Sequence, residues 1–284
     1  ITDRDRTIAD GRARQGTDWV DQMLLGGMLK CAEHGYRMIF ELVDTHSDHV
    51  ERELLAAIAA LQPDGIILTP PHSDNPQIVN FLADQKIPFA RIGSIQNGAG
   101  IPVSMDDEGS AQQATEYLLE RGHRRIGFIS GSSEYALSGW RVDGWQRAMA
   151  AAGAGTYGLL AAGDFSYASG EAAARQLLDR PDRPTAIIAS NDQMALATLE
   201  VARALDIAVP QQLSLISFDN TPLVHFTQPP LTAVDQPIAA TTSKAVELLI
   251  AAQKGDAAPQ DLTIVQASIF VRDSVAPLAG VPGA

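Results

Sequence analysis

The stretch Ala186-Ile-Ile-Ala-Ser-Asn-Asp-Gln-Met-Ala195 runs from four apolar residues directly into three polar ones and then into a helix-forming segment. This pattern predicts a buried strand followed by a helix, with Ser190, Asn191 or Asp192 as the residue that caps the helix. Capping needs only one of the three side chains. Asn191 carries both a donor and an acceptor, so capture of a polar ligand is an open alternative to capping at this position.

The same unit of strand and helix recurs along the chain. Short apolar runs predict strands, and amphipathic runs between them predict helices. We expect strands at 37–43, 64–69, 88–92, 125–130, 157–161, 185–189 and 213–218, and helices at 48–61, 76–85, 109–122, 139–152, 167–180, 192–205 and 238–253. Such alternation is typical of α/β proteins whose parallel strands are joined by crossover helices, and it predicts two wound lobes.

The regular alternation of predicted strands and helices ends after residue 218. Residues 228–237 have prolines at both ends of a β-prone core, which favours an extended segment, and two β-like runs follow the last helix at 262–267 and 269–272. The late helix is easiest to place if the chain returns to the first lobe. Three crossings would then form a hinge, with a ligand held in a cleft at the carboxyl ends of the strands.

This organisation gives predicted domain boundaries. The N-terminal lobe is expected at 1–130 plus 236–263, the C-terminal lobe at 131–235 plus 264–277, and a tail at 278–284. The opening strand of the first lobe is poorly marked, because only Thr7-Ile8-Ala9 has β character before residue 19. Either that strand is very short or some of its residues are absent from this chain.

Composition narrows the class of protein. The chain of 284 residues has a formal net charge of −13 and no continuous basic stripe, so by itself it is not expected to bind nucleic acid. No apolar run approaches the roughly 18 residues of a membrane span, and the N-terminus lacks a signal-peptide pattern. The single cysteine, Cys31, falls on an apolar helical face and is expected to be a buried structural thiol.

Sequence signatures of enzymes are missing. The chain has no Gly-x-Gly-x-x-Gly, no phosphate loop, no Gly-x-Ser-x-Gly elbow and no His-Glu-x-x-His, and we expect neither catalysis nor a cofactor. One dense cluster has metal-ligating side chains. It lies on a strand-to-helix loop, where polar surface and cap residues are normal, and this interpretation is favoured over a metal site. The cluster consists of Asp44, His46, Asp48 and His49.

Two charged residues stand at predicted strand or helix ends. Asp219 ends an apolar run, where its carboxylate could accept hydrogen bonds from adjacent sugar hydroxyls or form a turn into Thr221. Arg141 lies near the start of a helix, where a cation opposes the helix dipole, so a partner outside the helix is indicated. That partner is either a ligand or a carboxylate, for which Asp143 and Glu134 are the nearby choices.

Aromatic residues occupy similar positions. Phe165 follows the weak strand and precedes a helix, where it could stack on a sugar or base or simply pack onto the helix. Asp18 and Trp19 stand before the first long helix with the same ambiguity. Their assignment is weaker because the strand before them is unclear.

Seven segments in register resemble the effector-binding core of the lactose/galactose-repressor (LacI/GalR) family of bacterial transcription regulators. The resemblance extends from about residue 19 to residue 274. The matching segments are Ala32-Glu-His-Gly-Tyr36, Pro63-Asp-Gly-Ile-Ile-Leu68, Leu119-Glu-Arg-Gly-His-Arg-Arg-Ile-Gly127, Arg141-x-x-Gly-Trp145, Pro184-Thr-Ala-Ile-Ile-Ala-Ser-Asn-Asp192, Val209-Pro-Gln-Gln-Leu-Ser-Leu-Ile-Ser-Phe-Asp219 and Pro229-Pro-Leu-Thr-Ala-Val-Asp-Gln-Pro237.

The resemblance implies two similar doubly wound parallel-sheet lobes, Rossmann-like, joined by a three-strand hinge as in type I periplasmic binding proteins. It also implies a cytoplasmic homodimer that binds operator DNA through a helix-turn-helix headpiece, which this chain lacks, and that makes no contact with a membrane. By similarity, Arg141, Asn191 and Asp219 match the family's ligand-contacting residues, Phe165 matches its aromatic wall, and Tyr135 stands at a specificity position.

These observations predict an allosteric sensor that binds a small polar effector, with a sugar or polyol favoured because Asn191 occurs in sugar-responsive members of the family. Closure of the lobes around the effector would bias DNA binding. A periplasmic sugar-binding protein of a transport system is the first alternative. An enzyme on a doubly wound sheet is the second, although it would need a cofactor fingerprint or a nucleophile with its base.

Overall fold

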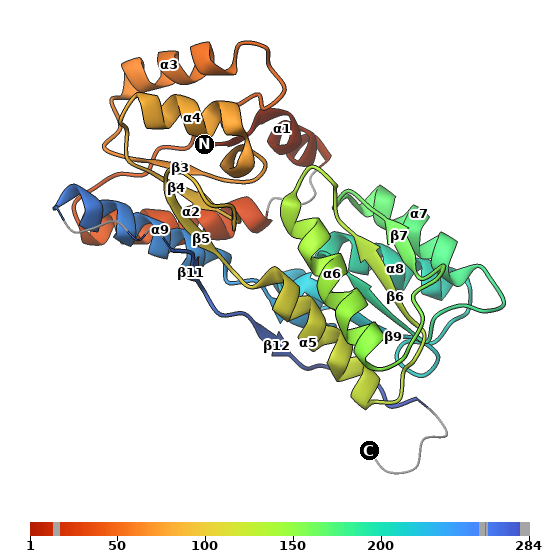
Figure 1. Ribbon diagram of the computed structural model, residues 1–284. Helices are drawn as coiled ribbons and strands as arrows, with labels where there is room; N and C mark the ends of the chain where they lie inside the picture. Colours follow the sequence, from red (N-terminus) through yellow and green to blue (C-terminus); the bar gives the residue numbers. More distant parts are fainter. Residues whose placement is uncertain (14–17, 256–258, 260, 279–284) are drawn as a thin grey trace. The chain divides into compact units, whose positions relative to one another are not determined.

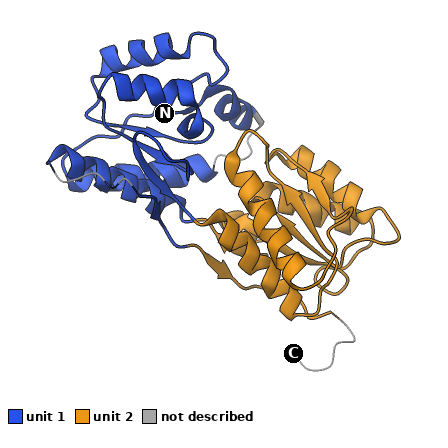
Figure 2. Ribbon diagram, viewed as in Figure 1, with its two compact units in different colours: residues 1–105, 237–266 blue, residues 106–236, 267–284 orange. Residues whose placement is uncertain are grey.

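The computed structural model describes residues 1–13, 18–255, 259 and 261–278, and the chain forms two compact units (Figure 2). Unit 1 comprises Ile1–Met105 and Pro237–Gln266, and unit 2 comprises Asp106–Gln236 and Ala267–Ala284. The chain therefore passes between the units three times, as the placement of the late helix predicts.

Unit 2 is built on a six-stranded sheet in the order β12-β10-β9-β8-β6-β7 (Figure 1). All neighbouring pairs are parallel except β10 and β12, which are antiparallel. The strands are β6 (Ile126–Ser130), β7 (Leu160–Ala162), β8 (Ala186–Ala189), β9 (Ser214–Asp219), β10 (Thr232–Asp235) and β12 (Ser268–Phe270). The central strands are apolar and almost wholly buried, as a sheet covered on both faces requires.

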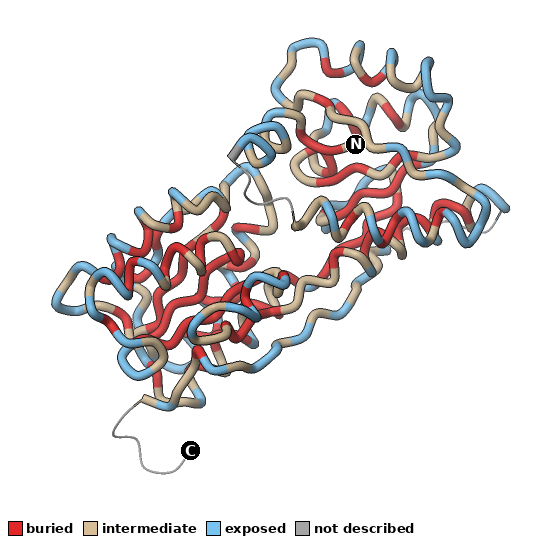
Figure 3. Tube along the Cα trace, turned by 180° about the vertical axis from the view of Figure 1, so that it is seen from behind, coloured by how far each residue is buried: buried red, intermediate tan, exposed pale blue. Residues whose placement is uncertain are grey.

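Helices cover both faces of this sheet. Figure 1 shows α5 and α6 on the near face and α7 and α8 on the far face, and each pair packs together. Their bounds are Asp107–Glu120 for α5, Ala136–Ala151 for α6, Tyr167–Leu178 for α7 and Asp192–Ala204 for α8, and a short 3-10 helix, η2, spans Pro222–His225. Figure 3 shows buried residues along the strands and the inner faces of these helices.

The division into units differs from the predicted boundary between residues 130 and 131. Residues 106–130 belong to unit 2, because α5 packs along α6 and β6 pairs with both β7 and β8. At the third crossing, β11 (Thr263–Ile264) pairs with β5 in unit 1. Of the predicted tail at 278–284, all but residue 278 lies outside the described residues.

Unit 1 contains a four-stranded parallel sheet in the order β11-β5-β4-β3 and a separate parallel pair, β1-β2. Its helices α3 and α4 cover one core, and α9 packs on the sheet and on α2. The elements are β1 (Thr2–Asp3), β2 (Leu42–Val43), β3 (Ile66–Leu68), β4 (Phe89–Ile92), β5 (Ile101–Ser104), α1 (Arg4–Ala13), α2 (Asp18–Glu33), α3 (Val50–Leu61), η1 (His72–Asp74), α4 (Pro76–Asp84) and α9 (Ile238–Gln253). Cys31 is buried against α9, as expected, and burial raises the pKa of its thiol.

The start of unit 1 differs from the expectation. The predicted β-like run at residues 7–9 lies within helix α1, and the strand before it has only two residues. Asp3 Oδ1 accepts a hydrogen bond of 2.7 Å from the Arg6 amide, and Arg6 pairs with Asp10 one turn later. These local contacts stabilise a polar helix despite the β-branched residues Thr7 and Ile8.

The two larger sheets are parallel apart from the β10–β12 pair and have helices on both faces, which confirms the predicted doubly wound α/β class. In such sheets, loops at the carboxyl ends of the strands are the usual place for a ligand. The fold therefore directs attention to the residues that follow β6, β7, β8 and β9 in unit 2.

Candidate functional site

Five of the seven candidate residues lie in unit 2, at or near the carboxyl ends of the strands of its sheet. Tyr135 follows β6, Phe165 follows β7, Asn191 follows β8 and Asp219 ends β9, while Arg141 is in the second turn of α6. Because these strands are parallel, their carboxyl ends form one edge, and residues that are far apart in sequence are brought to the same part of the unit.

Tyr135 and Phe165 form an aromatic pair at this edge. Their ring centroids are 5.6 Å apart and the rings are nearly perpendicular, at 77°. Phe165 has a φ of 72°, an uncommon backbone conformation for a bulky residue. Its ring lies on Gly131, where an added Cβ would come within 1.9 Å of a ring carbon. The glycine after β6 therefore makes room for the phenyl ring.

Asn191 caps helix α8. Its Oδ1 accepts a hydrogen bond of 2.9 Å from the Met194 amide, so the predicted capping role is confirmed. The same side chain makes a second hydrogen bond, in which Nδ2 donates to the carbonyl oxygen of Phe165 at 2.8 Å. Asn191 thus ties the loop after β7 to the loop after β8, and its amide is held in one orientation.

Arg141 is almost fully buried, with 1% of its surface exposed. Its Nε donates a hydrogen bond of 2.7 Å to Asp107 Oδ1, and its Nη1 donates one of 2.6 Å to the Ser190 carbonyl oxygen. The guanidinium also lies 4.4 Å from the centroid of the Phe218 ring. The carboxylate partner is therefore Asp107, at the start of α5, rather than Asp143 or Glu134, the two carboxylates weighed from the sequence.

Asp219 is half-buried at the end of β9 and has a φ of 89°. The next residue, Asn220, also has a positive φ, of 62°. Two hydrogen bonds fix the Asn220 side chain. Its Nδ2 donates to the Asp235 carboxylate at 2.8 Å, and its Oδ1 accepts from the Arg272 guanidinium at 2.6 Å. The backbone that carries Asp219 therefore turns sharply at a position held by neighbouring strands.

Sequence reasoning missed two buried acids at this edge. Asp107 is 3% exposed and Asp192 is 2% exposed. Burial raises the pKa of Asp107 despite its ion pair with Arg141, and burial raises the pKa of Asp192 to about 6. Both residues stand in the first turn of a helix, where acids are normally placed by the helix dipole, so nothing in the local pattern marked them as buried.

Asp18 and Trp19 lie in unit 1, in the first turn of α2, and both are half-buried. They therefore belong to a different unit from the other five candidates. Within unit 1, the structure assigns them to a helix start rather than to a loop that follows a strand.

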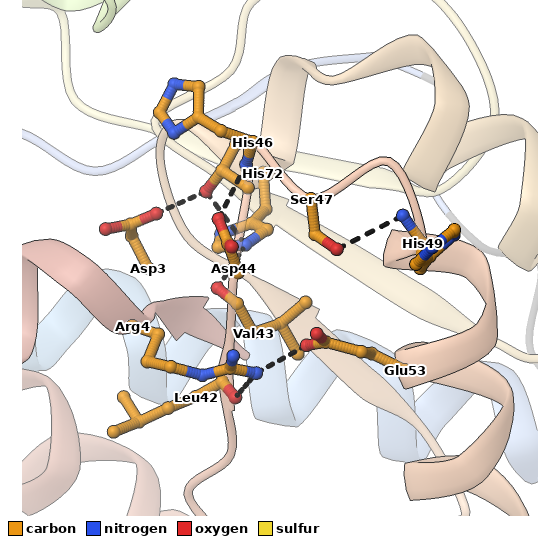
Figure 4. Close-up of polar contacts among 11 residues, drawn as sticks. Asp3, Arg4, Leu42, Val43, Asp44, His46, Ser47, His49, Glu53 and His72 are labelled. Atoms are coloured by element: carbon orange, nitrogen blue, oxygen red, sulfur yellow. Dashed lines mark hydrogen bonds and ion pairs between the residues drawn. The ribbon is translucent and has the colours of Figure 1, made fainter.

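The carboxyl edge of unit 1 has a polar network of its own (Figure 4). His72 is fully buried, and its Nε2 lies 3.1 Å from both the Val43 carbonyl and Thr45 Oγ1. Thr45 donates in turn to Asp3. Burial lowers the pKa of His72 to about 4, so the imidazole is neutral at physiological pH. This network ties together the ends of β1, β2 and β3.

The cluster around Asp44 forms local loop contacts. Asp44 Oδ1 accepts a hydrogen bond of 2.9 Å from the His46 amide, and Ser47 Oγ accepts one of 3.1 Å from the His49 amide (Figure 4). Among the described residues, no group of three or more His, Cys, Asp or Glu side chains is placed to hold a metal ion. These contacts are those of ordinary turn and helix-start residues.

A search of the described part of the chain finds no helix with the length and apolar character needed to cross a membrane. Residues 115–275 match the family described as periplasmic binding protein-like domain. This segment includes β6 to β10 and the five candidate residues of unit 2.

The similar proteins are transcription regulators. The chain is 31% identical to the HTH-type transcriptional regulator CelR of Thermobifida fusca and 30% identical to the HTH-type transcriptional repressor CytR of Escherichia coli, in each case over 89% of this chain and 74% of the relative. Both relatives are named as transcription regulators, which supports the regulator over the transport receptor.

Solved structures that are similar to this chain also belong to transcriptional regulators. A regulatory protein of the LacI family from Chloroflexus aggregans has a TM-score of 0.82 and 31% identity, over 90% of this chain and 92% of that one. A transcriptional regulator CelR–cellobiose complex has a TM-score of 0.80 and 30% identity, over 90% of this chain and 79% of that one. The chain therefore belongs to the LacI family of transcriptional regulators and has the periplasmic binding protein-like fold of their effector-binding core.

Proposed function

We propose that this chain senses a small polar effector, a sugar or polyol, through the residues at the carboxyl edge of unit 2, and so controls operator binding by a helix-turn-helix headpiece. The observation that carries the proposal is the convergence of Tyr135, Phe165, Asn191 and Arg141 at the edge where Asp219 ends β9. A relative of 30% identity forms a complex with cellobiose.

The chemistry of these side chains suits a sugar. A carboxylate such as Asp219 accepts two hydrogen bonds from adjacent hydroxyls, and aromatic rings pack against the apolar faces of a pyranose. Because Arg141 is paired with buried Asp107, this ion pair adds no unbalanced positive charge. A neutral polyhydroxy ligand therefore matches this edge better than an anion does.

We propose further that the regulator is a homodimer and that α2 contributes to the contact between subunits. Leu25, Met28 and Leu29 lie on one face of α2 and are 51%, 55% and 59% exposed. Such an apolar stripe is unusual on a free surface and is typical of a protein interface. A second copy of this chain is its occupant in the proposed dimer.

The effector proposal is tested by a thermal-shift screen of sugars, polyols and purines, followed by calorimetry. A true effector raises the apparent stability by mass action, by about 2.7 kcal/mol at a concentration of one hundred times Kd. Asp219→Ala should abolish this binding with little change in the melting temperature without ligand. Binding that survives the substitution would remove Asp219 from the site, and a response to purines alone would overturn the sugar assignment.

A further inference from the structure

Asp192 connects the start of α8 to the segment that carries Asp219. One carboxylate oxygen accepts a hydrogen bond from Ser217 Oγ on β9, and the other accepts 2.7 Å from the Thr221 amide. Its two partners therefore flank Asp219 on both sides in sequence. All three residues of this bridge are buried within unit 2.

The bridged segment has a backbone that needs support. Asp219 and Asn220 are consecutive non-glycine residues with φ values of 89° and 62°. Such conformations persist only where surrounding contacts hold them, and they gather at functional sites. Asn220 is held from β10 by Asp235 and from beyond β12 by Arg272. On the side of α8, the Asp192 carboxylate holds this segment through its hydrogen bonds with Ser217 Oγ and the Thr221 amide.

A purely local role for Asp192 does not explain its burial. An acid in the first turn of a helix interacts favourably with the helix dipole while it stays in solvent. Asp192 instead is 2% exposed, and this burial disfavours the charged carboxylate and raises its pKa to about 6. The hydrogen bonds to Ser217 and Thr221 offset part of this cost.

We propose that Asp192 is a positioning residue, which holds residues 218–221 in the conformation that presents the Asp219 carboxylate to the effector. This inference rests on the proposed role of Asp219. It differs from that role because Asp192 acts through Ser217 and Thr221 and requires no contact with the ligand.

The first test needs no ligand. Hydrogen exchange of the Thr221 amide and the Cα and Cβ chemical shifts of Asp219 and Asn220 are measured by NMR in Asp192→Ala, Asp192→Asn and the wild type. We expect exchange at Thr221 to be faster by about tenfold or more in Asp192→Ala, because a buried hydrogen bond is lost, and less so in Asp192→Asn, which keeps one acceptor.

The control is Glu200→Gln, which removes an exposed carboxylate from the same helix, where it pairs with Arg203. It should leave the Thr221 exchange rate and the shifts of Asp219 unchanged. Unchanged exchange and shifts in both Asp192 variants would overturn the inference, whatever the effector proves to be.

The second test measures calorimetric affinity for cellobiose at a temperature where every variant is fully folded. We expect Asp192→Ala to weaken binding by about tenfold, the scale of one lost buried hydrogen bond. A residue that merely stabilises the fold would leave the affinity of the folded protein unchanged, and that result would overturn the positioning role. Failure of the wild type to bind cellobiose would count against the proposed effector only, since Thr221 exchange is independent of it.

Discussion

Arg141 and Asp107 form a buried ion pair, with side chains only 2% exposed. Transfer of both charges out of water is expensive, and their attraction together with the bond from Arg141 to the Ser190 carbonyl offsets that cost. Removal of one partner leaves the other charge uncompensated. The two residues thus depend on each other, and the pair joins α6, α5 and the loop after β8.

Arg141→Ala should therefore destabilise unit 2 by about 3–5 kcal/mol, since Asp107 would be left buried without a partner. Urea denaturation monitored by the fluorescence of Trp145 measures the change in the free energy of unfolding. The matched control is Arg147→Ala, which breaks an exposed ion pair with Glu108 between the same two helices and should cost no more than about 1 kcal/mol. Equal effects of the two substitutions would contradict the assignment of Arg141.

His72 gives unit 1 a predictable dependence on pH. Its pKa is lowered to about 4, chiefly by burial, while an unfolded histidine titrates near 6.5. Between these values the unfolded chain binds more protons, so the free energy of unfolding falls as the pH is lowered from 6.5 to 4 and is fully retained above 6.5. The loss attributable to His72 is of the order of 3 kcal/mol.

The contribution of His72 is measured by hydrogen exchange of β3 at pH 7 and pH 4.5 in the wild type and in His72→Gln, which has no titratable ring. The variant should lose less stability between the two pH values than the wild type. His49→Gln, at an exposed position on the neighbouring loop, should behave like the wild type. An identical fall in both variants would show that other groups cause the acid sensitivity.

Individual site residues were predictable to different degrees. The run Ser190-Asn191-Asp192 marks a helix start, and the structure confirms Asn191 as the cap. The burial of Asp107 and Asp192 could not be read from the sequence. It depends on partners that come later in the chain, Arg141 in α6 for Asp107 and Ser217 in β9 for Asp192. Contact of the candidate residues with an effector stays a prediction.

At the scale of elements, glycine sets the approach of three helix pairs. An added Cβ on Gly26 in α2 would lie 2.0 Å from the Ala239 carbonyl oxygen in α9. The corresponding contacts are 2.0 Å from Gly144 in α6 to the Glu108 carbonyl oxygen in α5 and 2.5 Å from Gly170 in α7 to Met194 Cα in α8. In each pair the added Cβ would overlap backbone atoms of the partner helix. Rearrangement of side chains therefore cannot remove the clash that a larger residue would cause at the glycine position.

Gly144→Ala should consequently destabilise unit 2 by about 2 kcal/mol or more, because α5 and α6 must move apart. Gly139→Ala, in the same helix but with no atom within 4 Å of the added Cβ, should instead be neutral or stabilising, by up to about 1 kcal/mol. Thermal unfolding of the two variants gives the comparison. A stable Gly144→Ala protein would mean that the helices have room to separate at little cost.

Helices were more predictable than strands. The expected helix at 238–253 matches α9 in full, since its apolar residues recur at helical spacing over sixteen residues. The expected strand at 37–43 shrinks to Leu42–Val43, and β5 at Ile101–Ser104 was not anticipated. Strands of two to four residues carry too short a pattern for their bounds to be read from periodicity.

At the scale of the whole molecule, the three chain crossings were predictable from the late helix, but the position of the first crossing was not. The sequence places β6 at the end of the first wound segment, and only pairing shows that it joins β7 and β8. Assignment to one unit or the other is thus a property of contacts rather than of order along the chain.

The proposed dimer belongs to this scale. Leu29→Glu should raise the dimer dissociation constant at least about tenfold, because an apolar side chain worth about 1.5–3 kcal/mol on burial becomes charged. Sedimentation velocity across a dilution series measures it. Tyr157→Glu, at a residue 98% exposed in unit 2, is the control and should leave association unchanged. A wild-type protein that is monomeric at micromolar concentration would refute the dimer.

The repeated passage of the chain between units has a practical consequence for anyone who wishes to isolate one of them. Each unit is assembled from two separated stretches, so no single uninterrupted gene fragment encodes a complete unit. A simple truncation after residue 105 would deprive unit 1 of α9 and β11, and with them a covering layer and an edge of its sheet. Independent expression of unit 1 would require residues 1–105 and 237–266 to be joined in one polypeptide.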